Sequence, residues 1–507
     1  MLAQVTTFAI DGVQPRQVWL EVDIRAGLPA FTIVGLGDTA VRESRDRIRS
    51  AILNSRFRFP DRRITANLAP ASLRKAGPGF DAGLALGVLA ASDQLPAASL
   101  QGCAVFGELS LGGDLRDSPG ALAVAEGASR AGCTRLIVPR QRAREAALVE
   151  GLEVIAVATL REAAAVLAGE QAPALPRPEP ERDGAAASEP DLADVRGHEV
   201  PLLALQIAAA GGHNLLMEGA PGTGKTMLAR RLPSILPPLS REEAIEVTRI
   251  HSVAGLHARG LIRSRPFRAP HHSISAAGLA GGATPPRPGE ATLAHQGVLF
   301  LDELSEFSRP ALEALRQPLE DGHVTIVRGQ RSLSFPTRFM LVAATNPCPC
   351  GFAGVGDRCS CGEADLRRHR RRLSGPLLDR LDLLVDVRRP AESELRGPPR
   401  VSSAQARERI AVARDRQLAR LRGTGARCNG EMDARVVRSC AALEPDAESE
   451  LGRAYSDGLL SARGRLRVLR VARTVADLAG SDRIRRADVL LALSLRQRVD
   501  REAVGIG

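Results

Sequence analysis

The stretch Leu215-Leu216-Met217-Glu218-Gly219-Ala220-Pro221-Gly222-Thr223-Gly224-Lys225-Thr226 decides the fold. Residues 215–218 predict a short strand, residues 219–226 match the pattern GxxxxGK[ST], and residues 227–232 predict a helix. Glycines in such a turn let backbone N–H groups point inward, and the N-terminus of the helix adds partial positive charge. The sequence therefore predicts a phosphate-binding loop between a strand and a helix.

The whole loop is a candidate nucleotide site, and its residues are Gly219, Ala220, Pro221, Gly222, Thr223, Gly224, Lys225 and Thr226. We expect Lys225 to reach the β- and γ-phosphates and Thr226 to bind Mg²⁺. Of the 69 basic residues only Lys75 and Lys225 are lysines, which leaves 67 arginines. We interpret the two lysines as places where a flexible ammonium is needed. ATP and Mg²⁺ are the predicted cofactors.

Two more predicted strands end in polar residues. Val298–Leu301 is apolar and runs into Asp302, which we expect to hold the Mg²⁺ shell, and Glu303, which we expect to polarise the attacking water. Residues 339–345 form another apolar run and end at Asn346. We expect the Asn346 amide to bond the water or the γ-phosphate, although a turn-forming role before the next proline is the alternative.

Arg380 follows a predicted short helix in the stretch SGPLLDR (374–380) and precedes the predicted strand 383–387. We expect it to lie on the far side of the core from its own nucleotide. Such an arginine would reach the γ-phosphate bound by the next subunit of a ring. Because the chain is so rich in arginine, this prediction depends on the LLDR context and not on the residue type.

The chain of 507 residues has about the length of three domains. Residues 1–168 mix strand and helix patterns, and 169–190 hold five prolines and almost no large apolar residues, as a linker does. Residues 191–390 alternate strand and helix, which favours a parallel α/β sheet. Residues 391–507 are helical and arginine-rich. The predicted fold class is α/β, with an N-terminal α/β domain, a P-loop core and a C-terminal helical lid.

Composition limits the partners. The formal charge of +11 favours a polyanion, whereas one Trp and one Tyr argue against a protein that stacks many bases on aromatic rings.

The longest apolar runs fall short of the ~18 residues that a membrane span needs. The first eleven residues show no secretory signal. We expect a cytoplasmic location and no membrane partner.

Six further stretches resemble the ComM/YifB family of magnesium-chelatase-like AAA+ ATPases, and the resemblance runs almost end to end. They are DVRGHE (194–199), AAAGGHNLL (208–216), RPFRAPHHSIS (265–275), PGEATLAHQG (288–297), NPCPCG (346–351) and RLSGPLLDR (372–380). The resemblance implies a homo-hexameric DNA helicase that promotes branch migration in natural transformation and homologous recombination. Its implied partners are single-stranded or branched DNA and recombinase filaments.

The same resemblance implies roles for two arginines. Arg380 would be the finger that acts on the neighbouring subunit, and Arg463 would be sensor 2. Arg467 lies one helical turn further on, and the sequence does not separate it from Arg463.

Residues 322–335 predict a β-hairpin, because two alternating runs flank a glycine-containing turn. In the family this hairpin projects into the pore, so Arg328 and Arg331 are candidate DNA phosphate contacts. The alternative is an ordinary solvated hairpin. The Gly- and Pro-rich segment 272–290 is a second pore candidate. The run of five arginines within 367–372 is either a phosphate or subunit contact or a solvated face.

Four of the eight cysteines, Cys348, Cys350, Cys359 and Cys361, lie within fourteen residues. Their number and spacing suit a closed, structural Zn²⁺ site, although the CxC spacing departs from the commoner CxxC. The alternative is a surface loop with reduced thiols. Zn²⁺ is therefore a possible third cofactor.

Residues 74–86 resemble the nucleophile segment of the Lon protease domain, a ribosomal-S5-domain-2-like fold that also occurs without proteolysis. Lon-type chemistry needs a serine activated by a lysine. Here the equivalent stretch holds Gly79, Phe80 and Asp81, and Ser72 lies on the wrong side of the glycines. We expect a non-proteolytic domain in which Lys75 contacts DNA or a partner.

Three functions compete: an ATP-driven DNA motor, a chelatase-type remodeller of a protein partner, and an ATP-dependent protease. The missing serine argues against the protease. The N-terminal domain argues against the remodeller, because the resemblance implies that the chelatase ATPase subunit lacks it. The sequence favours the DNA motor.

Overall fold

The computed structural model describes most of the chain. The described residues are 1–35, 39–73, 75, 77, 79–175, 190–256, 260–282, 287–328, 331–354, 358–372, 375–398 and 400–496. The chain divides into two compact units, residues 1–182 with 241–262, and residues 183–240 with 263–507. Most of the predicted linker, residues 176–189, lies outside the described part.

The first unit is built on a mixed seven-stranded sheet with the order β3-β4-β2-β1-β5-β8-β9. The pairs β1–β2 and β2–β4 are antiparallel, and the others are parallel. A small hairpin, β6 (Glu108–Leu109) with β7 (Leu115–Arg116), lies beside it. The sheet strands are β1 (Leu2–Asp11), β2 (Gln14–Arg25), β3 (Ala30–Val34), β4 (Arg63–Ala69), β5 (Cys103–Val105), β8 (Arg135–Pro139) and β9 (Glu153–Val157).

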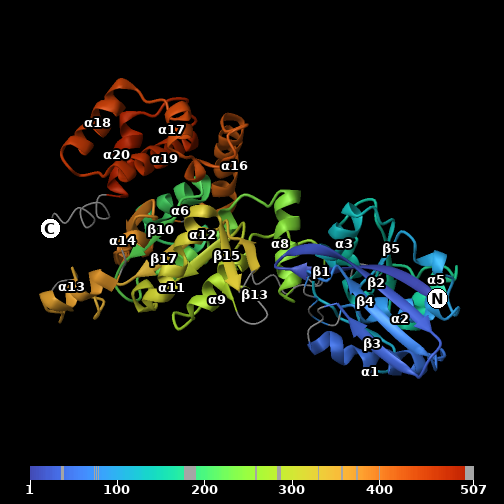
Figure 1. Cartoon of the computed structure of the whole chain (residues 1–507). Coiled ribbons are helices and arrows are strands. Elements are labelled where there is room, and N and C mark those ends of the chain that lie inside the picture. Colours follow the sequence, from blue (N-terminus) through green and yellow to red (C-terminus); the bar gives the residue numbers. More distant parts are fainter. Residues whose placement is uncertain are drawn as a thin grey trace. The chain divides into compact units, whose positions relative to one another are not determined.

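Helix α2 (Asp81–Ala91) is buried along its whole length against β1 and β2 (Figure 1). Small residues permit this close approach. A Cβ added to Gly83 would lie 2.7 Å from Leu20 Cδ1, and one added to Gly87 would lie 2.8 Å from Val22 Cγ2. The other helices of the unit's first 182 residues are α1 (Thr39–Asn54), α3 (Ala121–Arg130), α4 (Ala143–Ala146) and α5 (Leu160–Leu167).

Helix α8 (Arg241–Val253) also belongs to the first unit, although it lies within residues 191–390, the predicted ATPase core. It packs against α3. Ser252 Oγ accepts a hydrogen bond from the backbone N–H of Gly120 (3.1 Å), and Arg249 pairs with Glu126 (2.9 Å). Buried contacts with residues far back in the chain thus place α8 here, and a local pattern does not reveal them.

The second unit is built on a five-stranded parallel sheet with the order β11-β14-β17-β10-β18. This confirms the predicted parallel core. The strands are β10 (Leu215–Glu218), β11 (Phe267–Arg268), β14 (Val298–Leu301), β17 (Met340–Thr345) and β18 (Leu383–Asp386). Two antiparallel hairpins accompany it, β12 (Gly281–Gly282) with β13 (Arg287–Pro288), and β15 (His323–Arg328) with β16 (Arg331–Pro336).

Helices surround this sheet, and a helical region follows it in the chain (Figure 1). The helices from residue 199 to residue 395 in this unit are α6 (Glu199–Gly211), α7 (Lys225–Ala229), α9 (Ala276–Ala280), α10 (Glu290–Leu293), α11 (Arg309–Ala314), α12 (Arg316–Asp321), α13 (Glu363–Arg372), α14 (Gly375–Leu378) and α15 (Glu392–Leu395), of which α13 projects away from the sheet in Figure 1. The later helices are α16 (Ser403–Arg420), α17 (Ala434–Cys440), α18 (Pro445–Ser456), α19 (Ala462–Leu478) and α20 (Arg486–Ser494).

The sheet and the helical region share one hydrophobic core. Side chains of β10 and β18 lie in the same buried cluster as those of α6, α16 and α19. The predicted fold class, α/β with a C-terminal helical region, is confirmed. Among the described helices, none combines the length and apolar composition that crossing a bilayer requires.

Candidate functional site

The predicted phosphate-binding loop connects β10 to α7. Gly222 and Gly224 adopt φ values of 76° and 92°, in the left-handed region that glycine tolerates best. Gly219 approaches the next strand so closely that an added Cβ would lie 2.2 Å from the carbonyl oxygen of Val387. Two of the loop's glycines are therefore needed for backbone conformation, and the third is needed for close packing.

Lys225 lies inside this loop. Its Nζ donates hydrogen bonds to the carbonyl oxygens of Gly219 (2.6 Å) and Ala220 (3.0 Å) and to Asn346 Oδ1 (3.1 Å). Burial lowers the pKa of Lys225, and the nearby carboxylates, first that of Asp302, oppose this shift. A cation surrounded by oxygen acceptors, in a loop that turns around it, suits a phosphate group that would replace those acceptors.

Thr226 and Asp302 meet beside the lysine. Thr226 Oγ1 donates a 2.6 Å hydrogen bond to Asp302 Oδ2, although the two residues follow different strands, β10 and β14. A hydroxyl and a carboxylate at this distance offer the hard oxygen ligands that Mg²⁺ prefers. The described residues thus fit ATP with Mg²⁺.

Glu303 stands next to Asp302, and its backbone adopts the left-handed φ of 52°. Its N–H donates to Asp302 Oδ1 (3.0 Å), while its own Oε2 lies 3.3 Å from His272 Nδ1. The contact between His272 and Glu303 is not predicted from the sequence. The signal was the placement of a histidine just after β11, the strand next to β14.

Asn346 follows β17, and its Oδ1 accepts the hydrogen bond of the Lys225 ammonium, so the predicted amide lies at the phosphate-binding loop. Its backbone carbonyl lies 2.9 Å from Nε2 of His369, a buried residue of α13. Three arginines of the run lie near acids: Arg367 near Glu363 (3.5 Å), Arg368 near Asp365 (3.7 Å) and Arg372 near Glu306 (3.7 Å). This pairing favours the solvated-face interpretation of the arginine run.

Arg380 lies at the opposite end of the sheet from the phosphate-binding loop. Its carbonyl accepts a 2.9 Å hydrogen bond from Nδ2 of Asn214, the residue that precedes β10, whereas Lys225 follows the other end of that strand. Four strand residues separate the two ends by roughly 10 Å or more. The Arg380 guanidinium pairs with Glu320 of α12. Arg380 is therefore directed away from the nucleotide site of its own chain.

Arg463 and Arg467 both face that same end. Arg463, three-quarters exposed, lies 3.8 Å from Asp379, the neighbour of Arg380. Arg467 is largely buried and lies 3.7 Å from Asp382. Arg463 is thus the more accessible of the two sensor 2 candidates.

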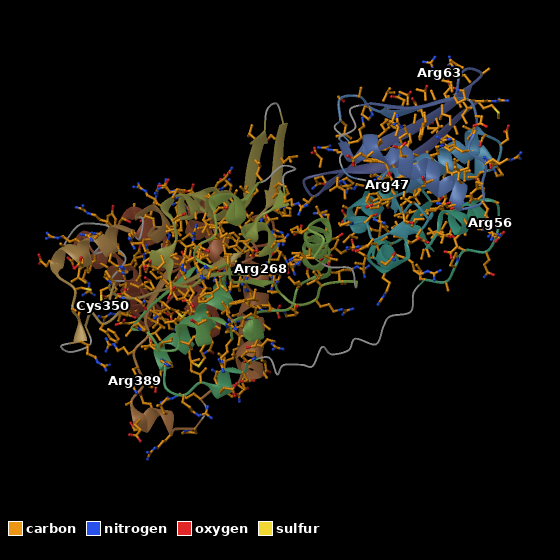
Figure 2. All side chains as sticks on the ribbon, turned by 90° about the horizontal axis from the view of Figure 1, so that it is seen from below. Arg47, Arg56, Arg63, Arg268, Cys350 and Arg389 are labelled. Carbon is orange, nitrogen blue, oxygen red and sulfur yellow. The ribbon has the colours of Figure 1, made fainter. Side chains whose placement is uncertain are left out.

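The predicted hairpin is present as β15 and β16, which stand out from the body of the second unit (Figure 2). Arg328 and Arg331 pair through their backbones at the end of the hairpin. Their side chains lie outside the described part of the structure. Of the second pore candidate, 272–290, residues 283–286 are likewise not described.

The four cysteines form one cluster, whose member Cys350 is labelled in Figure 2. All four Sγ atoms lie within 4.8 Å of one another, and Cys348 Sγ is 3.3 Å from that of Cys350 and 3.8 Å from that of Cys359. Four sulfurs held about 2.3 Å from a tetrahedral Zn²⁺ would be about 3.8 Å apart. The Phe352 N–H and the Cys348 thiol lower the pKa of Cys350 to about 6, whereas the pKa values of Cys359 and Cys361 are raised, so Cys350 is the member of the metal-free cluster that most readily becomes a thiolate.

Lys75 in the first unit is fully buried, and its ammonium donates to the carbonyl of Pro70. This does not support the expectation of a DNA contact, because a phosphate at the surface does not reach a buried ammonium. We interpret Lys75 as a structural residue.

Nearby in the sequence, Asp81 is buried at the start of α2. It accepts hydrogen bonds from Arg47 Nε (2.8 Å) and Leu109 N (3.3 Å).

Three models of the magnesium chelatase family match the chain in order. The model described as subunit ChlI of Mg-chelatase matches residues 20–142, the model described as magnesium chelatase, subunit ChlI, matches 191–395, and the model of the ChlI C-terminal part matches 400–496.

Complete bacterial chains are similar as well. YifB of Escherichia coli is 43% identical over 499 residues, which cover 98% of this chain and 97% of YifB. Competence protein ComM of Haemophilus influenzae is 42% identical over 506 residues, 98% of each chain. The Holliday junction branch migration complex subunit RuvB of Thermobifida fusca is 32% identical over 262 residues, 49% of this chain and 62% of RuvB. The chain therefore belongs to the YifB/ComM family of magnesium-chelatase-like AAA+ ATPases.

Proposed function

We propose that this protein is the subunit of a hexameric ring that hydrolyses ATP to move DNA, and that it promotes branch migration. The proposed ATPase activity rests on one observation: the residues that follow three strands of the sheet lie together. Lys225 bonds Asn346, and Thr226 bonds Asp302, so the residues after β10, β14 and β17 share one site.

Each group has a proposed role in this site. The loop 219–226 binds the phosphates, Thr226 and Asp302 hold Mg²⁺, and Glu303 draws a proton from the attacking water. Asn346 orients that water or the γ-phosphate. Bound Mg²⁺ would neutralise charge that develops on the phosphate oxygens.

The placement of Arg380 supports the proposed ring. It lies at the end of the sheet remote from Lys225, so it acts on a nucleotide only if a neighbouring copy presents one. Arg463 lies beside it, and we propose that both arginines contact the neighbour's nucleotide.

Three observations support DNA as the moved partner. The formal charge is +11, a hairpin with arginines at its end stands out from the ATPase unit, and ComM is 42% identical over nearly the whole chain. DNA held by phosphates alone would pass through such a ring with little sequence preference. The second candidate, a remodeller of a protein partner, is favoured by the match to models of magnesium chelatase subunits, one of which covers residues 20–142 of the N-terminal domain and so weakens the argument that this domain is foreign to chelatases.

ATP hydrolysis with and without DNA separates the two candidates. We expect single-stranded and four-way-junction DNA to raise the rate several-fold, and we expect Lys225→Ala and Glu303→Gln to lose hydrolysis with either DNA. Arg396→Ala, which changes an exposed arginine paired with Glu392, is the matched control and should behave as the unchanged chain. A rate that no DNA alters would favour the protein remodeller.

A further inference from the structure

The side chain of Asn214, the residue that precedes β10, joins two other parts of the second unit. Its Nδ2 donates a 2.9 Å hydrogen bond to the carbonyl oxygen of Arg380, and its Oδ1 accepts a 2.8 Å hydrogen bond from the backbone N–H of Leu341 in β17. A side-chain amide carries a donor and an acceptor, so one asparagine satisfies both backbone groups. Asn214 therefore fixes the backbone of Arg380 relative to the start of β17.

The backbone of Asn214 holds the same segment. Its N–H donates to Asp382 Oδ2 (3.1 Å), and its carbonyl oxygen accepts from the N–H groups of Asp382 (2.9 Å) and Leu383 (3.0 Å). The buried Asp382 carboxylate also lies 3.7 Å from His213 Nδ1 and 3.7 Å from Arg467 Nε. The residues just after Arg380 are thus anchored next to the start of β10.

A second side chain holds the residues that follow Arg380. Arg496 is almost fully buried, and its Nη1 donates to the carbonyl oxygens of Leu381 (2.6 Å) and Asp382 (3.4 Å). The carbonyl groups of residues 380, 381 and 382 therefore each accept a hydrogen bond from a side chain. A backbone that is held at three successive positions has little freedom to shift, so these contacts fix where the Arg380 side chain begins.

The strands β10 and β17 both lead to the candidate nucleotide site. They are parallel neighbours, β10 runs into the phosphate-binding loop, and β17 ends just before Asn346, whose Oδ1 contacts the Lys225 ammonium (3.1 Å). Asn214 lies at the opposite end of this pair of strands. It therefore connects the strands that carry the chain's own nucleotide site to the arginine proposed to act on a neighbour's nucleotide.

We propose that Asn214 is a positioning residue for Arg380, and that it aligns this arginine with the two strands that carry the nucleotide site of the same chain. The inference rests on the proposed function, in which Arg380 acts on the nucleotide of a neighbouring copy. Asn214 acts on that nucleotide through the backbone of Arg380 and not by contact. A misplaced arginine slows the chemical step and leaves the phosphate-binding loop able to hold ATP.

Two substitutions remove the donor to Arg380 in different ways. Asn214→Asp keeps the size of the side chain and the acceptor for Leu341, but it replaces the Nδ2 donor by a carboxylate oxygen. Asn214→Ser removes the amide without adding a charge. We expect each variant to lower the kcat of ATP hydrolysis about tenfold and to leave the Kd for ATP within about twofold.

Asn54→Asp is the matched control. Asn54 Nδ2 donates a 2.7 Å hydrogen bond to the carbonyl oxygen of Leu111 in the first unit, so the substitution removes the same kind of bond elsewhere in the chain. We expect this variant to hydrolyse ATP as the unchanged chain does.

Mixed rings show whether Asn214 acts through Arg380. Asn214→Asp chains keep a complete phosphate-binding loop, and Lys225→Ala chains keep Arg380 and its supports. We expect this mixture to regain part of the lost hydrolysis, as a mixture of Arg380→Ala with Lys225→Ala should. A residue that only supported the strands of its own chain would damage its own nucleotide site, and Lys225→Ala chains would not restore activity to it.

The outcomes separate the two levels of the proposal. Recovery with Arg380→Ala but not with Asn214→Asp would overturn the role of Asn214 and leave the proposed ring standing. Recovery with neither variant, although the chains assemble together, would refute the shared site and the inference with it. An unchanged kcat in both Asn214 variants, a Kd for ATP that rises in step with the loss of kcat, or failure of both variants to fold would also overturn the role of Asn214.

Discussion

At the residue scale, Asp81 is a carboxyl group whose ionisation is costly in the folded chain. Burial raises the pKa of Asp81 to about 6, and the hydrogen bond and charge of Arg47 only partly oppose this shift. Asp81 Oδ1 is buried and, within the described residues, has no hydrogen-bond partner. The folded chain therefore binds this proton more tightly than the unfolded chain does.

The consequence is a stability term that depends on pH. A raised pKa gives stability that is fully present below about pH 4 and is lost as the pH rises through about 6. We expect the free energy of unfolding to fall by about 2 kcal/mol more in the unchanged chain than in Asp81→Asn between pH 4 and 6.5. Urea titrations at both pH values measure this difference. Asp46→Asn, at an exposed site, is the control. An equal change in the free energy of unfolding between the two pH values in Asp81→Asn and in the unchanged chain would refute the expectation.

The sequence predicted site residues where a strand end marked them. Lys225, Asp302 and Asn346 each follow an apolar run, and parallel strands bring such ends together. The contact between His272 and Glu303 was not predictable in this way. It depends on which strand lies beside β14, and on a backbone φ of 52° at Glu303 that no residue type reveals.

At the scale of elements, the cysteine cluster connects the end of β17 to α13. We expect the purified full chain to carry about one Zn²⁺, and Cys359→Ser to reduce this content and lower the melting temperature by several degrees. Elemental analysis and thermal denaturation measure both effects. Cys440→Ser, outside the cluster, is the control. Full zinc content in Cys359→Ser, or none in the unchanged chain, would contradict the zinc site.

The hairpin β15–β16 is the element that we expect to meet DNA. Each phosphate contact that is removed lowers the slope of log K against log salt by about 0.7 to 0.9. The double variant Arg328→Ala/Arg331→Ala should therefore bind single-stranded DNA more weakly and with a smaller salt slope. Fluorescence anisotropy at several salt concentrations gives the slope. If the salt slope of the double variant equals that of the control variant Arg396→Ala, the hairpin is a solvated surface that does not contact DNA.

Strand alternation predicted this hairpin because its two runs are adjacent in the chain. Helix α8 shows where local patterns fail. Its residues Arg249 and Ser252 contact Glu126 and Gly120, and this partnership places the helix in the first unit. Such long-range pairing leaves no mark on the helical pattern of residues 241–253.

At the scale of the whole molecule, the proposed ring has active sites to which two neighbouring subunits contribute. A mixture of two inactive variants tests this directly. Arg380→Ala chains keep a complete loop, and Lys225→Ala chains keep the arginine, so a mixed ring holds some intact sites. We expect the mixture to regain part of the ATPase activity that neither variant has alone.

The matched control is a mixture of Lys225→Ala with Glu303→Gln. Both residues belong to one side of the site, so no interface of this mixed ring is intact, and we expect no recovery. Recovery in the control, or none in the first mixture although the variants assemble together, would show that Arg380 does not act between subunits.

If ATP hydrolysis moves DNA, as we propose, the protein drives branch migration of a synthetic four-way junction. We expect the purified chain to convert the junction to its two duplex products with ATP, at a rate that exceeds the uncatalysed one by at least tenfold. Lys225→Ala should give no conversion. Conversion that does not require ATP, or its absence under conditions where the chain hydrolyses ATP and binds the junction, would contradict the DNA motor.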